Sequence, residues 1–305
     1  MRTDTYDRLL ADLGATFRPQ REWVDGRGLY LIVGHFLSGV GAGTWLFSLL
    51  FDVGPGLALA IAAVGLGGLA HLLFLGRPAR FWRMVRVRTS WIGRGFLGMN
   101  LFTVGAVLYA LPRFVPGAPW AAGGPVGRLG LAVSLVGMAL LMVYKGNVYA
   151  ASRGVPFWNS PLLPVLYIAY SLRAGVALLL VVFFFDGPRV PSELAAVIEL
   201  WIAVSAAIMV AFYLGVMRNA NVAARRSVAE LTRGRAAGPF YLGTVAAGLV
   251  VPIAVGLAGF LHPLSMAVLG LVGALSLIGD FFAKYTIAKA GIYVPVLPAG
   301  MTAAR

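Results

Sequence analysis

Eight long stretches of apolar residues dominate the sequence, and turn-forming residues separate them. The stretches cover 29–51, 56–75, 93–111, 129–151, 161–185, 194–217, 240–261 and 264–288. Each is close to the roughly 20 residues that a helix needs to cross a bilayer. Proline, glycine and aspartate mark the breaks, for example at 52–55, 116–125 and 186–188. The runs are continuously apolar and do not alternate with a period of two, so they predict an all-α integral membrane protein with eight transmembrane helices and exclude a membrane β-barrel.

The first 28 residues follow a different pattern. They contain five acidic residues and no uninterrupted apolar core, so they do not resemble a signal peptide. Tyr6, Leu9, Leu10 and Leu13 follow helical spacing. We expect residues 1–28 to form an N-terminal arm with a short amphipathic helix that lies on the membrane or on a partner.

Composition narrows the possible functions. Hydrophobic residues make up 60% of the 305 residues and charged residues only 12%, against about 25% charged in soluble domains. These values exclude a soluble or disordered protein. The chain has no cysteine, which excludes disulfides, cysteine-ligated iron–sulfur clusters, cysteine-based zinc sites and thioether-attached haem in this subunit. No segment is long enough to house a nucleotide or a pterin, so if the protein does redox work, the other redox centres belong to another subunit.

The basic residues predict an orientation. The formal net charge is +14. Twenty-one of the 25 basic residues fall in the segments 1–28, 76–94, 145–153, 218–235 and 284–305, all on one side of an eight-helix topology. By the positive-inside rule, both termini are cytoplasmic. The tryptophans Trp23, Trp82, Trp91 and Trp158 fall at the same side, where we expect an interfacial belt.

Polar residues from several helices converge at one depth near the basic face. His35, His71 and Tyr144 lie in the first, second and fourth apolar stretches. Proton-bearing groups at the end of an apolar cleft are what a quinone head group requires, and histidine can exchange the accompanying proton. Residues expected to shape the pocket and its mouth are Arg77, Trp91, Arg94 and Asn147.

Two other interpretations of these residues stay open. The histidines can simply bond neighbouring helices while Tyr144 anchors the interface. Alternatively, His35 and His71 can ligate a haem b. Electron transfer through two haems is excluded, because it needs four axial ligands and the chain has three histidines.

A second polar group lies deeper in the predicted membrane. It comprises Arg173, Glu199, Asp280 and Lys284. Intramembrane charges are costly and therefore indicate function, here a proton or ion path. The alternative is a buried ion pair, such as Arg173 with Asp280, that fixes packing. The same four residues also support a different class of protein, a secondary transporter or ion channel.

The connector after the second stretch is rich in arginine and aromatic residues. Residues expected to dock a partner protein are Arg80, Phe81, Trp82, Arg83, Arg86 and Arg88. Lipid head groups are the alternative ligand, but the aromatic content exceeds what they require.

The sequence resembles the NrfD-type family, which includes the polysulfide reductase membrane subunit. The resemblance is carried by the segment HLLFLGRPARFWR at 71–83, followed by SWIGRG at 90–95, and by the glycine-rich run at 36–43. The run Tyr144-Lys145-Gly146 and the later segment 157–160 are also similar to the family. These matches cover residues 29–165; the second half agrees in helix number and length.

The resemblance implies a fold, a function and partners. It implies two four-helix bundles, at 29–151 and 161–288, followed by a C-terminal tail at 289–305. It implies that quinone, menaquinone or ubiquinone, binds in the first bundle, with no haem and no metal in this chain. It also implies a docked four-cluster iron–sulfur subunit and a molybdopterin-type catalytic subunit, with no activity expected from this chain alone. In several members these subunits lie outside the cytoplasmic membrane. Here either the partner is cytoplasmic, which the basic face favours, or arginines used for docking override the positive-inside rule.

Overall fold

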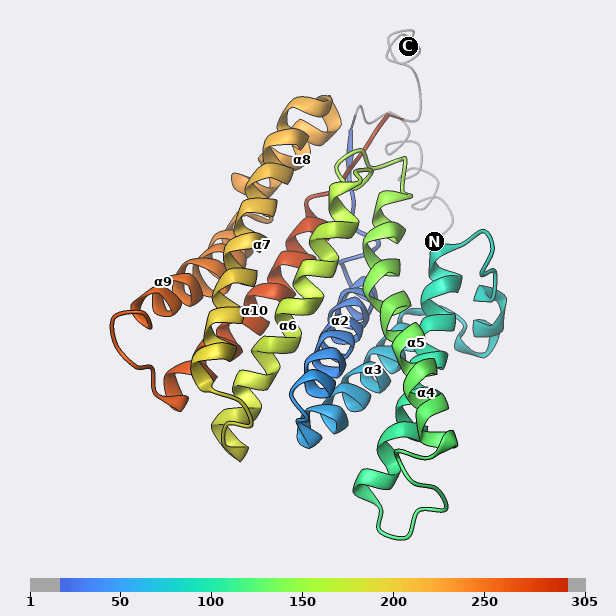
Figure 1. The fold of residues 1–305 in the computed structure, drawn as a ribbon. Helices are drawn as coiled ribbons and strands as arrows, with labels where there is room; N and C mark the ends of the chain where they lie inside the picture. The colour runs from blue at the N-terminus through green and yellow to red at the C-terminus, as the bar shows by residue number, and fades with distance from the viewer. Residues whose placement is uncertain (1–16, 296–305) are drawn as a thin grey trace, which may run out of the picture.

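The computed structural model describes residues 17–295 and is built almost entirely from helices (Figure 1). Within that part of the chain, eight helical segments are long and apolar enough to cross a membrane, which confirms the predicted all-α membrane fold. The segments are α2 (Gly28–Leu50), α3 (Gly54–Phe74), α4 (Trp91–Phe114), α5 (Pro125–Ala150), α6 (Leu162–Asp186), α7 (Ser192–Ala220), η2 (Pro239–Val250) continued by α9 (Val251–Ala258), and α10 (Met266–Lys289). The predicted amphipathic helix around Tyr6 and Leu13 lies outside the described residues.

The ends of the helices follow from local capping chemistry. Helix α4 begins at Trp91, two residues earlier than predicted, because the Ser90 hydroxyl accepts a hydrogen bond from the backbone N–H of Gly93 at 3.3 Å. Helix α5 begins at Pro125, earlier than the predicted 129, because proline suits the first turn of a helix. Ser265 caps α10 in the same way as Ser90 caps α4. The predicted boundaries are therefore off by a few residues where a cap extends the helix.

The seventh span departs from a regular α-helix. Its first part, η2, is a π-helix, a rare form that is frequent at functional sites. It packs directly on α10, because a Cβ added to Gly248 would lie 2.6 Å from Cα of Gly279. The sequence pattern identifies the span but not its π-helical winding.

Several short elements that the pattern does not predict gather at one end of the bundle. They are the 3-10 helix η1 (Pro78–Met84), the helix α8 (Val222–Thr232) and the strands β1 (Arg18–Pro19) and β2 (Ile292–Tyr293). The two strands pair antiparallel, with Arg18 opposite Tyr293. This pairing joins the two ends of the described chain on the same side as η1 and α8 (Figure 1).

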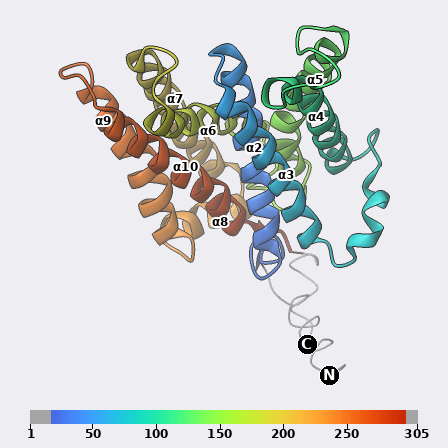
Figure 2. The same cartoon turned by 90° about the horizontal axis from the view of Figure 1, so that it is seen from below.

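Helix α2 occupies the centre of the arrangement. It packs against α3, α5, α6 and α10, whereas α4 packs mainly on α5 (Figure 2). The contact with α6 is very close, because a Cβ on Gly175 would lie 2.2 Å from the carbonyl carbon of Gly43. Small residues allow such approaches between membrane helices. Division into bundles at 29–151 and 161–288 stays a prediction.

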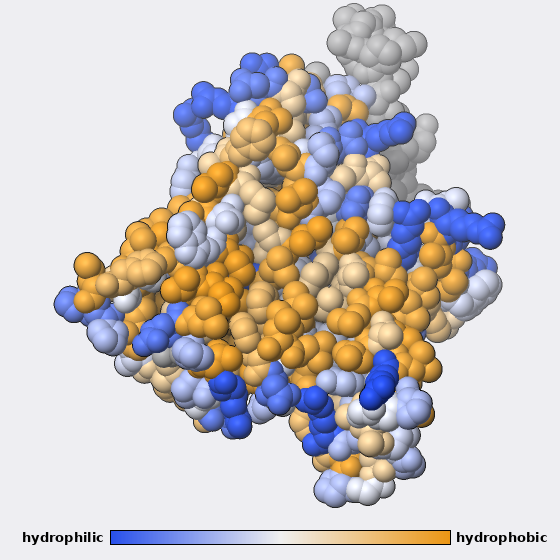
Figure 3. Space-filling view, viewed as in Figure 1, coloured by the Kyte–Doolittle hydropathy of each residue, from blue (hydrophilic) through white to orange (hydrophobic). Residues whose placement is uncertain are grey.

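The outer surface carries a broad apolar belt. Large apolar side chains such as Leu66, Trp201 and Leu242 are exposed, and the belt runs across the middle of the molecule with polar residues above and below it (Figure 3). An exposed apolar band of this kind matches a chain surrounded by lipid.

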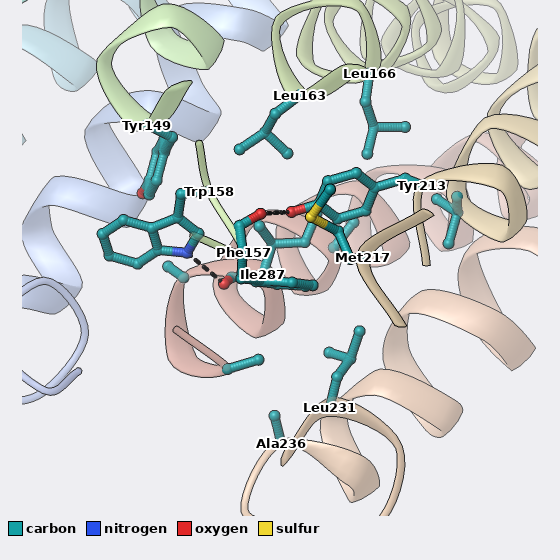
Figure 4. Close-up of a cluster of buried hydrophobic side chains, with 14 of the residues drawn as sticks. Tyr149, Phe157, Trp158, Leu163, Leu166, Tyr213, Met217, Leu231, Ala236 and Ile287 are labelled. Atoms are coloured by element: carbon teal, nitrogen blue, oxygen red, sulfur yellow. Dashed lines mark hydrogen bonds between the residues drawn. The ribbon is translucent and has the colours of Figure 1, made fainter. Parts of the chain in front are cut away.

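Aromatic side chains, among them Tyr149, Phe157, Trp158 and Tyr213, pack with aliphatic side chains in a buried cluster (Figure 4). The indole N–H of Trp158 donates to the backbone carbonyl of Ile287 at 2.9 Å, and the Tyr213 hydroxyl donates to the carbonyl of Phe157. Trp158 is only 1% exposed. Its predicted place in an interfacial belt is therefore wrong, because a long-range hydrogen bond and the ring of Tyr149 bury it.

Candidate functional site

Three side chains from different helices meet at one point of the interior. The ring centroids of His35 on α2 and His71 on α3 lie 5.3 Å apart, and the ring of Tyr144 on α5 lies 5.8 Å from His35. The Tyr144 hydroxyl lies 3.4 Å from Nε2 of His71 and 3.4 Å from Oγ of Ser38. The structure thus brings together the three residues predicted to face a quinone head group.

Hydrogen bonds fix the orientation of the His71 imidazole. Its Nδ1 lies 2.7 Å from the carbonyl oxygen of Gly67, one turn earlier on α3. Because a carbonyl can only accept, Nδ1 carries the proton and Nε2 is left as the acceptor that faces the Tyr144 hydroxyl. Glycine at position 34 makes room for this ring, since a Cβ there would lie 2.4 Å from Nδ1 of His71.

His35 is buried and only partly satisfied. The side chain is 2% exposed, and its Nδ1 makes no hydrogen bond to any described residue. A buried polar atom without a partner is unusual in a folded protein and calls for an explanation. The ring of Tyr149 covers another side of the imidazole, at 5.7 Å between centroids.

These side chains border a cavity of about 360 Å³. Apart from the polar cluster the lining is apolar, with contributions from α2, α3, η1, α4 and α5. The apolar and aromatic lining residues are Trp23, Leu31, Phe74, Leu75, Met84, Ile92, Phe96, Met99 and Val148. Met84 belongs to η1 and Ile92 is exposed, so the cavity reaches the arginine-rich end of the molecule. Its volume and its few polar groups fit a small, mostly apolar ligand.

Four residues predicted to shape the pocket do not line this cavity. The guanidinium of Arg94 lies 4.1 Å from the Trp91 ring and donates to the carbonyls of Val87 and Arg88. It therefore holds the segment between η1 and α4. The Asn147 amide donates to the Val143 carbonyl within its own helix at 2.8 Å, and Arg77 is exposed. A part in the site for Arg77, Trp91, Arg94 and Asn147 stays a prediction.

A second buried cluster joins four helices around Arg173 of α6. The guanidinium donates to Glu199 Oε1 on α7 at 3.1 Å and to Asp280 Oδ1 on α10 at 2.8 Å. It also donates to Oγ of Ser276 at 2.7 Å and to the carbonyl of Gly248 in the π-helix. The structure therefore contains the buried ion pair that is one of the two interpretations of these residues.

Lys284 lies beside this cluster without joining it. The side chain is 1% exposed and its Nζ makes no hydrogen bond to a described residue. Nζ lies 5.1 Å from the ring centroid of Tyr170 and 5.7 Å from that of Phe36. The four residues of the predicted path are thus close together, but only Arg173, Glu199 and Asp280 form ion pairs.

Comparisons with known proteins assign the chain to a family. The family profile described as Polysulphide reductase, NrfD matches residues 27–296. The chain belongs to this family. It is 29% identical to Protein NrfD of Escherichia coli over 276 residues, which cover 82% of this chain and 84% of that protein. It is 22% identical to the C subunit of polysulfide reductase from Wolinella succinogenes over 254 residues, which cover 73% of this chain and 80% of that subunit.

Family membership confirms the predicted resemblance and supports a multi-pass membrane subunit of a redox complex.

In this NrfD-family chain, the residues predicted to dock a partner lie on or after η1 and are exposed. Trp82 is 61% exposed, and the guanidinium of Arg83 lies 5.4 Å from its ring. The structure therefore presents these side chains outward, next to the end of the cavity that Met84 lines.

The haem interpretation fits this geometry poorly. Bis-histidine ligation places a macrocycle between two imidazoles, each with a free nitrogen directed at the iron. Here the ring centroids of His35 and His71 lie only 5.3 Å apart with their planes inclined at 59°, and Nε2 of His71, the nitrogen that does not bond Gly67, lies 3.4 Å from the Tyr144 hydroxyl.

Sequence reasoning missed most of the cavity lining and gave no site role to one charged residue beside Tyr144. The apolar lining residues cannot be told by residue type from the many other apolar residues of the chain. Lys145 is fully buried on α5, next to Tyr144, with Nζ 5.8 Å from the ring centroid of that tyrosine. A lysine inside an apolar stretch is the signal that could have identified it.

Proposed function

We propose that this chain is the quinone-interacting membrane subunit of a multisubunit oxidoreductase. It exchanges electrons between the membrane quinone pool, menaquinone or ubiquinone, and an iron–sulfur subunit docked on the η1 face. The iron–sulfur subunit, with four clusters, connects to a molybdopterin-type catalytic subunit. The family of the chain and the apolar cavity with its imidazole and phenol groups support this proposal.

The observation that carries the proposal is the cavity that His35, His71 and Tyr144 share. A quinone ring is flat and apolar, with two carbonyl oxygens that accept hydrogen bonds. The Tyr144 hydroxyl can turn from His71 toward such an oxygen, and His35 has an unpartnered nitrogen. Reduction of a quinone by two electrons takes up two protons, and imidazole is the side chain best suited to take up a proton and pass it on near neutral pH.

The docking face fits the same proposal. Arg80, Arg83, Arg86 and Arg88 are exposed around η1, while Met84 of the same segment lines the cavity. A partner bound here would bring its nearest redox centre close to the bound quinone. By the positive-inside rule this face, and both termini with it, are cytoplasmic in the inner membrane.

Binding of a quinone analogue to the full chain tests the proposal. Menadione is titrated into the purified protein in nanodiscs, and quenching of tryptophan fluorescence reports binding near Trp23. We expect His71→Ala to weaken binding at least tenfold and to abolish quinol-dependent turnover of the complex, with assembly intact. The matched control is His262→Ala, because His262 is exposed and does not line the cavity. Equal menadione binding by the wild type and the His71 variant would show that this cavity is not the quinone site.

A further inference from the structure

A groove on the lipid-facing surface is lined only by apolar side chains and has a volume of about 560 Å³. Helix α2 forms its floor, and α3 and α10 lie on either side of α2 (Figure 2). Phe36 and Leu37 line the groove from α2, whereas His35 of the same helix lines the cavity described above. The groove and the cavity are therefore separate and lie on different faces of α2.

The groove opens at the depth of the hydrocarbon core of a membrane. Its walls come from 59–66 and 277–282, in the middle parts of α3 and α10. Leu66 and Ile278 stand at the rim, 57% and 47% exposed, whereas Val40 and Ala63 are buried at the floor. A helix of about 20 residues and about 10 Å across occupies more than about 2000 Å³, so the groove is too small to take in a helix of a partner. It has room for a flexible apolar chain, such as the acyl chains that surround a protein at this depth.

A polar end lies on the same face of α10 as the groove. Ile278, Phe282, Tyr285 and Lys289 follow one another at intervals of four, three and four residues, which places them in one stripe along the helix. The ring of Tyr285 is nearly parallel to that of Phe281, with 14° between the planes and 6.3 Å between the centroids. Nζ of Lys289 lies 2.8 Å from the Tyr285 hydroxyl oxygen. Because Phe281 lines the groove, direct contacts lead from the groove to the amine, which is about 10 Å further along the helix axis than Phe282.

Lys289 lies at the level where a membrane has its charged head groups, since it is the last residue of α10. Its ammonium has three N–H donors and, among the described residues, makes one hydrogen bond, to Tyr285. The guanidinium of Arg235 donates to the Lys289 carbonyl at 3.3 Å and pairs with Glu230 at 3.0 Å. Two cations and one carboxylate therefore give this end of α10 a net positive charge, which attracts an anionic head group.

We propose that the groove binds one acyl chain of an anionic phospholipid whose phosphate is held by Lys289. The apolar groove and the amine above it match the two parts of such a molecule, whereas a quinone has no charge for the amine to bind. The bound chain fills the space between α3 and α10 and holds both helices against α2. The inference does not depend on quinone binding, because no residue of the groove lines the cavity.

Native mass spectrometry of the purified full-length chain in detergent tests this inference. Phosphatidylglycerol and phosphatidylcholine with the same acyl chains are titrated separately, and the Kd of the first bound lipid is measured for each. Lys289→Gln removes the charge; its matched control is Arg218→Gln, because Arg218 is exposed near the end of α7. Ala62→Trp fills the groove; its matched control is Ala211→Trp, because Ala211 is exposed on α7 and does not line the groove.

We expect the wild type to bind phosphatidylglycerol at least fivefold more tightly than phosphatidylcholine. Lys289→Gln should reduce this preference to less than twofold, while Lys289→Arg and Arg218→Gln should keep it. Ala62→Trp should weaken phosphatidylglycerol binding at least fivefold, with Ala211→Trp at the wild-type affinity.

Equal affinity of the wild type for the two lipids would overturn the inference, and so would an undiminished preference in Lys289→Gln. Because Lys289→Gln leaves the groove intact, it decides the question even if Ala62→Trp does not fold. A copurified quinone that is lost in Ala62→Trp and kept in Ala211→Trp would assign the groove to that molecule instead. A dimer lost in the same way would assign it to a second copy of the chain.

Discussion

The hydroxyl of Tyr144 and Nε2 of His71 lie 3.4 Å apart, although 73 residues separate them in the sequence. The contact crosses from α5 to α3, and the hydrogen bond from Nδ1 of His71 to the Gly67 carbonyl orients it. A ligand carbonyl that enters the cavity can replace His71 as the acceptor of the Tyr144 proton. Under the proposed function, the pair exchanges this internal hydrogen bond for one to the ligand.

Removal of the Tyr144 hydroxyl tests this exchange. We expect Tyr144→Phe to weaken menadione binding about tenfold, equivalent to about 1.4 kcal/mol, because a single hydrogen bond to the ligand is lost. The ring remains, so the thermal unfolding midpoint should stay close to that of the wild type. Fluorescence titration measures the affinity. Tyr241→Phe is the control, because Tyr241 is 49% exposed and does not line the cavity; an equal loss of affinity in both variants would contradict the assignment.

Glycine at position 34 allows α3 to bring its histidine against α2. A methyl group there would lie 2.4 Å from two atoms of the His71 ring, so the ring must move or the helices must separate. We expect Gly34→Ala to destabilise the protein by about 1–3 kcal/mol, as overpacking usually does, and to reduce menadione affinity. Gly65→Ala on α3 is the control, since a Cβ there meets nothing within 4 Å. Thermal unfolding in detergent and the same titration separate the two variants; wild-type behaviour of Gly34→Ala would contradict the close packing.

The sequence identifies the three polar residues of the cavity. It does not show which of the other predicted residues reach the cavity, and the reason is physical. His35, His71 and Tyr144 can be identified because counting residues from the basic face gives the depth of a side chain along its helix axis. Counting does not give the rotation about that axis or the partner that a flexible side chain selects. Arg94 stacks on Trp91 and Asn147 bonds its own helix, so neither reaches the cavity.

The ion cluster shows the same limit of prediction from helical spacing. The spacing of Asp280 and Lys284 predicts that both lie on one face of α10. It cannot show that Arg173 reaches Asp280 while Lys284 is not paired. That choice depends on the π-helix η2, whose Gly248 carbonyl also binds Arg173. Long-range backbone geometry of this kind leaves no local pattern in the sequence.

Loss of the central guanidinium should destabilise the fold strongly. In Arg173→Met the carboxylates of Glu199 and Asp280 remain buried without their shared partner. Breaking a buried ion pair in this way costs about 3–5 kcal/mol. Arg189→Met is the control, because Arg189 pairs with Asp186 at an exposed site where such pairs contribute about 0–1 kcal/mol. The thermal unfolding midpoints of the two variants are compared with that of the wild type. Equal shifts would show that the ion pairs of Arg173 do not stabilise the fold more than an exposed pair does.

The arginine-rich face makes a prediction about assembly. Arg83 and Arg86 are exposed beside the cavity entrance, and an acidic partner would be attracted to them through long-range electrostatics. We expect the double substitution Arg83→Glu and Arg86→Glu to reduce the partner protein recovered with the tagged chain at least fivefold, and binding to the wild type to weaken as salt rises. Menadione binding should remain, because neither side chain lines the cavity. The control is Arg128→Glu with Arg189→Glu, which reverses two charges at the opposite end of the helices; an equal loss of partner in both double variants would argue against docking at η1.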